Sequence, residues 1–227
     1  MSTQIKEHPI IFSGSMIRAI LDGSKSQTRR VISPQPVDED ECGPYIQVPE
    51  VTDWGCGETL TFMGRKHIKC PYGVPGDMLW VRETFVIEDT GDYGPPNPLP
   101  EDRPVRIEGD DIEGEIYLIP HYRATEPEPH IVPWDRIDGC DDTTRWHPSI
   151  HMPRWASRIS LTVKDVRVER VQDISEEDAR DEGVEFAPAG PGNCTNYVIG
   201  FADLWDSINA RRGYGWDVNP WVWRVEF

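Results

Sequence analysis

The sequence predicts an α+β fold, and three observations support this. Its clearest strand pattern covers residues 159–171, where Ile159, Leu161 and Val163 alternate with other residues and further valines follow. The helical segments are short and do not alternate regularly with strands, as they would in a doubly wound sheet. Nine tryptophans supply large burial units, although only 37% of the 227 residues are hydrophobic. We therefore expect a mixed, strand-rich barrel or a curved sheet.

The first predicted elements are a short strand, a helix and a second strand. In HPIIFSGSMIRAILDG (8–23), one of the serines can cap a helix, and Gly23 is a natural stop. TRRVI (28–32) then predicts the start of a strand. Residues 33–74 are rich in proline, glycine and acids, which is typical of an insertion that can hold a hairpin.

The second part of the chain alternates regular elements with irregular sequence. PGDMLWVRETFVI (75–87) predicts a turn and a strand, and residues 86–152 are dominated by prolines and acids, as in a second insertion. Residues 173–184 predict a short helix that begins at Ser175 and ends at Gly183. We expect one domain over residues 1–227, completed by two further elements: a helix at 199–213 with Phe201, Leu204, Trp205 and Ile208 on one face, and a closing strand at 219–227.

The charge of the chain is strongly negative but unevenly distributed. The formal net charge is −17, which argues against binding a polyanion through a broad basic face. Residues 1–36 nevertheless carry a local charge of +3, whereas residues 85–145 hold sixteen acids against five arginines. A small or locally engaged ligand suits the positive segment better than a long duplex. Because no apolar run is long enough to cross a bilayer and the N-terminus has no signal-peptide core, we expect a cytoplasmic protein without a membrane partner.

The cysteines predict a reducing compartment. They are five, an odd number, and none forms a CxxC pair, so a disulfide framework is not expected. A zinc site built from Cys42, Cys56, Cys70 and His67 is an alternative, but its spacing is not that of a familiar zinc module. We expect reduced thiols, no bound metal and no cofactor.

The segment LDGSKSQTRRVI (21–32) concentrates positive charge in an acidic chain and contains the first candidate residues. A lysine becomes a base when burial or neighbouring cations lower its pKa, and Arg29 and Arg30 lie close to Lys25 in the sequence. A base of this kind could activate the hydroxyl of Thr28, while the arginines could stabilise an oxyanion or hold a phosphate. The alternative is a solvated loop between a helix and a strand.

The other candidates are a carboxylate and a group of aromatic and polar residues. Glu182 lies in the last turn of a predicted helix, where the helix dipole disfavours a carboxylate, so it could be retained for proton transfer; the alternative is an exposed acid. Aromatic residues beside arginines can stack on a base, but they can equally belong to the core. We expect the substrate-binding residues to be Arg29, Arg30, Asp77, Trp80, Glu83, Tyr122, His151 and Trp155.

Four segments share a pattern with one protein family. ILDGSKSQTRR (20–30) fits a helix followed by Gly-x-Lys-[Thr/Ser]-x-Thr-x-Arg, and PGDMLWVRETF (75–85) fits a Gly-Asp turn with a strand. Residues 159–183 fit a strand and a short helix ending in a glutamate, and NPWVWRVEF (219–227) fits a closing strand. The chain thus resembles the ASCH domain family, which has a PUA-like fold, and in particular its N(4)-acetylcytidine amidohydrolases. The two predicted insertions lie outside the match, and longer proteins of this layout look like phage or prophage members.

The resemblance implies amide hydrolysis on a modified nucleobase or nucleoside. The family's catalytic lysine, threonine and glutamate fall on Lys25, Thr28 and Glu182, with Ser26 where the small enzymes often have threonine. Lys25 would act as base or orienter, Thr28 would supply a hydroxyl or position water, and Glu182 would pass a proton to the leaving amine. Arg30, or the backbone near Gly76–Asp77, would stabilise the oxyanion.

Two other functions remain open on the sequence alone. PUA-like domains are often non-catalytic readers of RNA or modified bases, which would bind single-stranded RNA or DNA through an aromatic cage around Trp80 and Trp155. A ribonuclease or a phage assembly factor is a further alternative. Fold alone does not choose among these functions.

Overall fold

The computed structural model divides the chain into two compact units, each assembled from two separate stretches of sequence. The structure describes residues 4–40, 43–53, 59–90, 98–109, 115–128, 145–184 and 197–227. Unit 1 comprises Met1–Gly23 and Gly76–Thr162, and unit 2 comprises Ser24–Pro75 and Val163–Phe227. The predicted insertion at 33–74 lies in unit 2 and that at 86–152 lies in unit 1, while the single-domain assignment stays a prediction.

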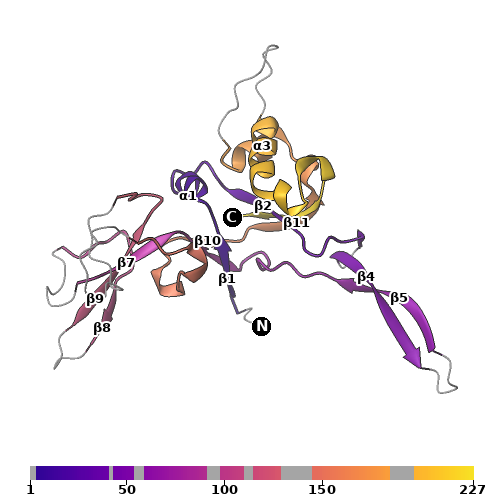
Figure 1. The fold of residues 1–227 in the computed structure, drawn as a ribbon, viewed down its shortest axis with the longest axis horizontal. Helices are drawn as coiled ribbons and strands as arrows, with labels where there is room; N and C mark the ends of the chain where they lie inside the picture. The colour runs from indigo at the N-terminus through magenta and orange to yellow at the C-terminus, as the bar shows by residue number, and fades with distance from the viewer. Residues whose placement is uncertain are drawn as a thin grey trace, which may run out of the picture. The chain divides into compact units, whose positions relative to one another are not determined.

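Unit 1 contains two three-stranded sheets, with strand orders β1-β6-β10 and β7-β9-β8 (Figure 1). Strand β1 runs parallel to β6, and the other pairs in these sheets are antiparallel. Buried residues of β7, of β9 and of the two 3-10 helices form one core cluster: Phe85, Ile87, Tyr122, Met152 and Ala156. The elements of unit 1 are β1 (Glu7–Ile11), α1 (Gly14–Leu21), β6 (Met78–Arg82), β7 (Phe85–Asp89), β8 (Arg106–Glu108), β9 (Ile116–Tyr122), η2 (Ser149–His151), η3 (Arg154–Ala156) and β10 (Ser160–Thr162).

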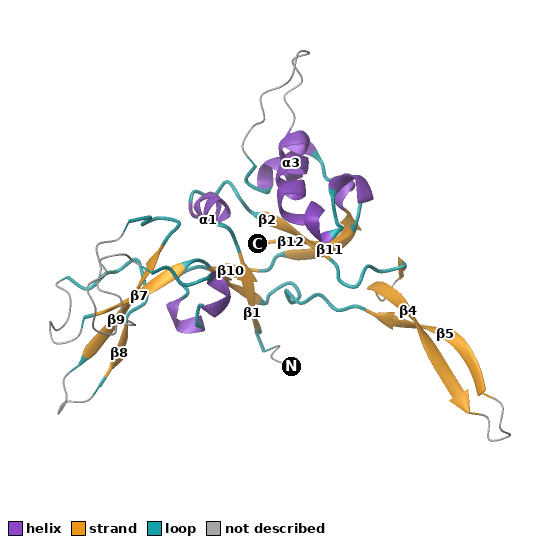
Figure 2. Ribbon diagram, in the orientation of Figure 1, coloured by secondary structure: helices purple, strands orange, loops and turns teal. Residues whose placement is uncertain are grey.

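Unit 2 also contains two three-stranded sheets, with strand orders β11-β12-β2 and β3-β4-β5, and Figure 2 shows its helices beside the first sheet. Both sheets are antiparallel throughout. The helices pack on the first sheet through a core cluster of Val171, Ile174, Ala179, Phe201, Trp205 and Val222. The elements of unit 2 are β2 (Gln27–Val31), β3 (Asp38–Asp40), β4 (Gly43–Asp53), β5 (Thr59–His67), β11 (Asp165–Arg170), η4 (Val171–Asp173), α2 (Glu176–Asp181), α3 (Tyr197–Asn209), η5 (Ala210–Arg212), η6 (Trp216–Val218) and β12 (Trp221–Glu226).

These sheets confirm the α+β class. Among the described residues, however, none of the four sheets closes into a barrel, so the PUA-like barrel stays a proposal. The hairpin expected within 33–74 is formed by β4 and β5, which pair antiparallel from Tyr45 opposite His67 to Asp53 opposite Thr59. No helix in the described part of the chain is long and apolar enough to cross a membrane.

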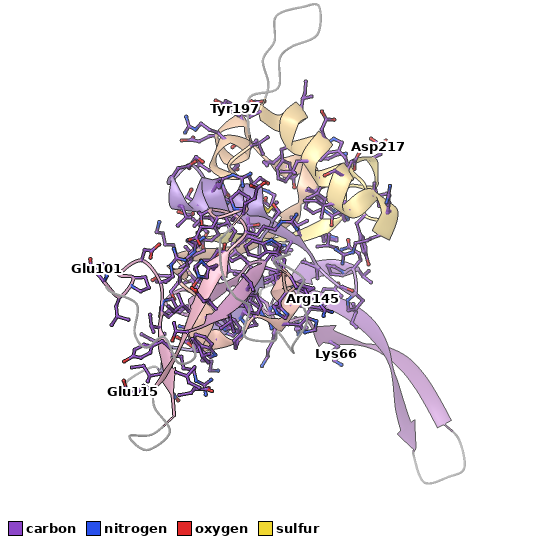
Figure 3. All side chains as sticks on the ribbon, turned by 60° about the vertical axis from the view of Figure 1, so that its left-hand side comes forward. Lys66, Glu101, Glu115, Arg145, Tyr197 and Asp217 are labelled. Atoms are coloured by element: carbon purple, nitrogen blue, oxygen red, sulfur yellow. The ribbon has the colours of Figure 1, made fainter. Side chains whose placement is uncertain are left out.

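Most local signals are confirmed, with one error in the longest helix. Ser13 caps α1 by accepting a hydrogen bond from the Met16 amide, and Gly23 follows the helix with a φ of 79°. In α3, which begins at Tyr197 (Figure 3), Phe201 and Trp205 are buried as predicted. Ile208 is instead 45% exposed, and Asn209 takes the buried position. The Asn209 amide donates to the Trp205 carbonyl oxygen, which compensates for burying a polar group there.

Candidate functional site

The centre of the candidate site is a buried ion pair between Lys25 and Glu182 in unit 2. The Lys25 ammonium lies 2.6 Å from Oε2 of Glu182 and also donates to its backbone carbonyl oxygen at 2.8 Å. Both side chains are almost fully buried, at 0% and 4% exposure. The two residues also form an antiparallel backbone bridge, so two segments distant in the sequence are fixed together at this point.

Local sequence explains where each partner of this pair lies. Gly23 ends helix α1 in the left-handed region, and Lys25 follows just before β2. On the other side, Ser175 and Asp178 form a reciprocal capping box that begins α2, and Gly183 follows its end with a φ of 74°. The carbonyl groups at a helix C-terminus lack partners within the helix, and the Lys25 ammonium satisfies the one at Glu182.

Arg29 holds the second oxygen of Glu182 and two further carboxylates. Its guanidinium lies 2.6 Å from Glu169, 3.4 Å from Asp178 and 3.3 Å from Glu182. The Arg29 side chain has no exposed surface, because it lies between the β11-β12-β2 sheet and the helices and contacts the ring of Phe201. Arg29 therefore orients the Glu182 carboxylate, and its predicted contact with a substrate stays a prediction.

Asp178 is held by two additional side chains. Gln27 donates to it at 2.9 Å, and Arg224 donates to it at 3.1 Å and to Gln27 at 2.6 Å. Burial opposes ionisation of Asp178, but hydrogen bonds from Gln27 and Ser175, with the charges of Arg29 and Arg224, lower its pKa to about 2. The cluster thus joins three basic side chains (Lys25, Arg29 and Arg224) to three carboxylates (Glu169, Asp178 and Glu182). Arg224 also lies 3.7 Å from Asp165 and 3.7 Å from Glu226.

Burial makes Lys25 a better proton donor than a lysine in water. It lowers the pKa of the Lys25 ammonium, an effect that Glu182 partly offsets and that the charges of Arg30 and Arg29 reinforce. Burial likewise raises the pKa of Glu169, while Arg29 opposes that change. A lysine whose pKa is lowered and whose ammonium contacts a carboxylate is suited to proton transfer.

Thr28 and Arg30 are on the other face of β2. Side chains alternate along a strand, and Gln27 and Arg29 point toward α2. This alternation directs Thr28 and Arg30 to the opposite face, where their partners in β12 are Val225 and Trp223. Thr28 is buried at 2% exposure. The structure therefore brings the amine and the carboxylate together but directs the hydroxyl away from the face that carries Arg29.

The other predicted substrate-binding residues all belong to unit 1. Asp77 accepts a hydrogen bond from the Lys6 amide at 3.0 Å and so ties the Gly-Asp turn to the strand β1 that follows Lys6. Trp80 is half-buried, with the guanidinium groups of Arg82 and Arg154 at 5.1 and 5.9 Å from its ring. Asp77 thus serves the fold, and Trp80 offers an aromatic surface flanked by cations.

Glu83 and Tyr122 form a second buried cluster, also in unit 1. Glu83 accepts two hydrogen bonds from Arg158, each at 3.0 Å, and the Arg158 guanidinium lies 3.9 Å from the centre of the Tyr122 ring. The Tyr122 hydroxyl donates to the Ala156 carbonyl oxygen at 2.8 Å. Burial raises the pKa of Glu83, and the hydrogen bond and charge of Arg158 oppose that change.

His151 and Trp155 line one pocket of unit 1 with a volume of about 430 Å³. They project from η2 and η3, whose neighbouring residues Met152 and Ala156 belong to the core cluster. Glu83, another predicted substrate-binding residue, lines a second pocket of unit 1 with a volume of about 300 Å³.

The described residues contain no group of three or more His, Cys, Asp or Glu side chains that could hold a metal ion. Of the cysteines in the alternative zinc site, Cys70 carries a free thiol whose pKa is raised to about 11 by burial. Cys42 and Cys56 lie outside the described residues, so that alternative is not tested.

Sequence reasoning missed three residues of the charged cluster: Glu169, Asp178 and Arg224. Glu169 lies in β11, Arg224 lies in β12, and Asp178 belongs to the capping box of α2. In the sequence, each of them could be explained by local structure without a role in a functional site. The available signal was the spacing of Gln27 and Arg29, because side chains two positions apart on a strand point to the same face. If that face is buried, the charge of Arg29 requires charged partners there.

Comparison with known proteins assigns neither a family nor a function to this chain. The sequence matches no family model and no curated protein, and the structure matches no solved structure. The resemblance to the ASCH domain family therefore stays a prediction.

Proposed function

We propose that the chain is a hydrolase that cleaves an amide bond on a modified nucleobase or nucleoside, of the N4-acylated cytidine type. The observation that supports this best is the buried contact of 2.6 Å between Lys25 and Glu182. The same two residues were selected from the sequence as candidates for proton transfer. The proposal includes the ASCH-type PUA-like fold and a cytoplasmic location.

The proposed reaction begins with a proton transfer within the pair, from the Lys25 ammonium to the Glu182 carboxylate that it contacts. Neutral Lys25 then takes a proton from the attacking water, whose oxygen bonds to the acyl carbon and forms a tetrahedral oxyanion. Glu182 then delivers a proton to the exocyclic nitrogen as the carbon–nitrogen bond breaks, which releases the carboxylic acid and the free amine. Arg30, whose charge acts on Lys25 and is acted on by Glu182, would stabilise the oxyanion. Thr28 takes no part in this scheme, because its hydroxyl is directed to the other face of β2.

Burial supports these roles, because a lysine is a base only where its ammonium form is disfavoured. Burial and two neighbouring arginines lower the pKa of Lys25, and Arg29 fixes the orientation of the carboxylate. The formal charge of −17 supports a single nucleoside rather than a polyanion as the substrate.

Release of acetate from N4-acetylcytidine tests the proposal. The unmodified protein should release cytidine, and Lys25→Arg should reduce kcat by at least about a hundredfold, because a guanidinium keeps its proton. Lys164→Arg is the matched control: this lysine of the same unit donates to the Phe227 carbonyl oxygen and lies outside the charged cluster. Release by Lys25→Arg at the rate of the unmodified protein would contradict the assignment of the base.

A second candidate function is a non-catalytic reader of modified or single-stranded nucleic acid. The observation that favours it is Trp80, whose ring is flanked by Arg82 and Arg154 and could stack on a base beside a phosphate. A reader predicts binding that weakens steeply with salt and no change of the nucleoside. Binding of a single-stranded oligonucleotide, measured against salt concentration, separates the two functions.

A further inference from the structure

The pocket of unit 1 that His151 and Trp155 line has a size and a lining that suit a flat ring. Its volume of about 430 Å³ lies within the range of small-molecule sites, and its lining is mainly apolar. Two aromatic residues contribute to it, Phe85 from β7 and Trp155 from η3, together with Ile116 and Leu118 of β9. Aromatic faces beside branched aliphatic side chains favour a planar ligand over a flexible one.

Backbone hydrogen bonds hold this pocket in shape. The segment that carries His147 is joined to Phe85 by two such bonds, at 2.8 and 3.2 Å, and the two rings lie 5.5 Å apart. On the other wall, Met152 and Ala156 are buried in the core cluster and fix the two 3-10 helices that carry His151 and Trp155. A pocket built on these supports needs little rearrangement to bind a ligand.

The polar groups of the pocket suit the edge of a heterocycle. His147 and His151 contribute imidazole rings, which both donate and accept hydrogen bonds. At the rim, the Arg106 guanidinium lies 5.7 Å from the centre of the Trp155 ring and forms an ion pair with Glu108 at 2.8 Å. Since the Arg106 charge is already paired with Glu108, a neutral ligand is favoured over a phosphorylated one.

We propose that this pocket binds a neutral planar heteroaromatic ring of nucleoside size, stacked on Trp155 with its edge toward His147 and His151. This inference does not rest on the amide hydrolysis proposed above. It concerns binding by unit 1, whereas the proposed proton-transfer pair belongs to unit 2.

Isothermal titration of the full chain with cytidine and adenosine, which are not acylated and cannot be hydrolysed, tests the inference. Both nucleosides should bind, ribose should not, and the 5′-monophosphates should bind more weakly than the nucleosides. Trp155→Leu should weaken binding by at least about tenfold, because a base loses its stacking partner. Trp221→Leu is the matched control, since Trp221 also lies under an arginine, with Arg170 at 4.1 Å, but belongs to unit 2.

A second variant keeps the test decisive if loss of Trp155 unfolds the chain. Ile116→Trp should fill the pocket and abolish binding while Trp155 is retained, because Ile116 is 36% exposed at the lining and can accept a larger side chain. The inference is overturned if neither nucleoside binds at millimolar concentration, or if both pocket variants bind as the unmodified protein does. Loss of binding in Lys25→Ala with normal binding in Trp155→Leu would also overturn it, because the ligand would then occupy unit 2. Failure of N4-acetylcytidine hydrolysis alone would leave these binding results unchanged.

Discussion

Two buried ion pairs, one in each unit, are built from different cations and are suited to different tasks. In unit 1, Arg158 holds Glu83 through two parallel hydrogen bonds of 3.0 Å, the geometry in which arginine binds a carboxylate best. In unit 2, Lys25 holds Glu182 at one oxygen, and Arg29 holds the other. An arginine keeps its proton in proteins, whereas a buried lysine can release one. The pair in unit 1 thus suits a structural role, whereas the pair in unit 2 suits the proton transfer that we propose.

The largest effect on stability should follow from breaking the ion pair between Arg158 and Glu83. Arg158→Met leaves the Glu83 carboxylate buried without its partner, and we expect a loss of about 3–5 kcal/mol in the free energy of unfolding. Lys25→Met should cost less, because Arg29 still contacts Glu182 at 3.3 Å. Urea denaturation of both variants measures the difference, and an equal loss would show that the two pairs serve stability alike.

The next effect concerns acid stability. Because the pKa of Asp178 is lowered to about 2, its carboxylate contributes stability above the usual pKa of 3.8, and this is lost as the pH falls toward 2. We expect Asp178→Asn to lower the free energy of unfolding by about 2 kcal/mol at pH 6 and by much less near pH 2. Ionisation of Glu83 affects the free energy of unfolding in the opposite direction. Burial raises the pKa of this carboxyl, so its charged form opposes folding. Denaturation curves across this pH range test the prediction, which a pH-independent cost of Asp178→Asn would contradict.

The smallest effect concerns the turn that precedes Lys25. Gly23 has a φ of 79° and nothing within 4 Å of an added Cβ, so Gly23→Ala strains the backbone without a clash. We expect a loss of about 1 kcal/mol. Gly76→Ala in unit 1 is the matched control, with a φ of 95° and the same open surroundings. Thermal melts of both variants should show similar losses, and an unchanged melt for Gly23→Ala would show that this turn adapts.

The elements that local chemistry determines could be predicted from the sequence. The cap at Ser13, the stops at Gly23 and Gly183, and the capping box at Ser175 each depend on residues within one turn of a helix. Lys25 and Glu182 were also selected from the sequence, since each is a charged group at an unusual position. Their contact could be expected only through the family resemblance, because they lie 157 positions apart.

The features that could not be predicted from the sequence depend on packing between distant segments. The ion pairs of Arg29 depend on such packing, because the pairing of β2 with β12 places this side chain on the buried face beside Glu169 and Asp178. Ile208 fits an amphipathic helix, yet the surface at that position is left open and Asn209 is buried instead. The pocket beside Trp155 is built from four stretches of unit 1, and no local pattern in any of them specifies it.

The pairing of β2 with β12 has a consequence for biosynthesis. Gln27 lies opposite Glu226, so β2 cannot pair until β12, far later in the chain, has been synthesised. The two stretches of unit 1, in contrast, have both been synthesised once residue 162 is made. Until β11 and α2 have been synthesised, Lys25 and Arg29 lack the carboxylates that they contact, and nascent unit 2 exposes a basic segment that the folded protein conceals.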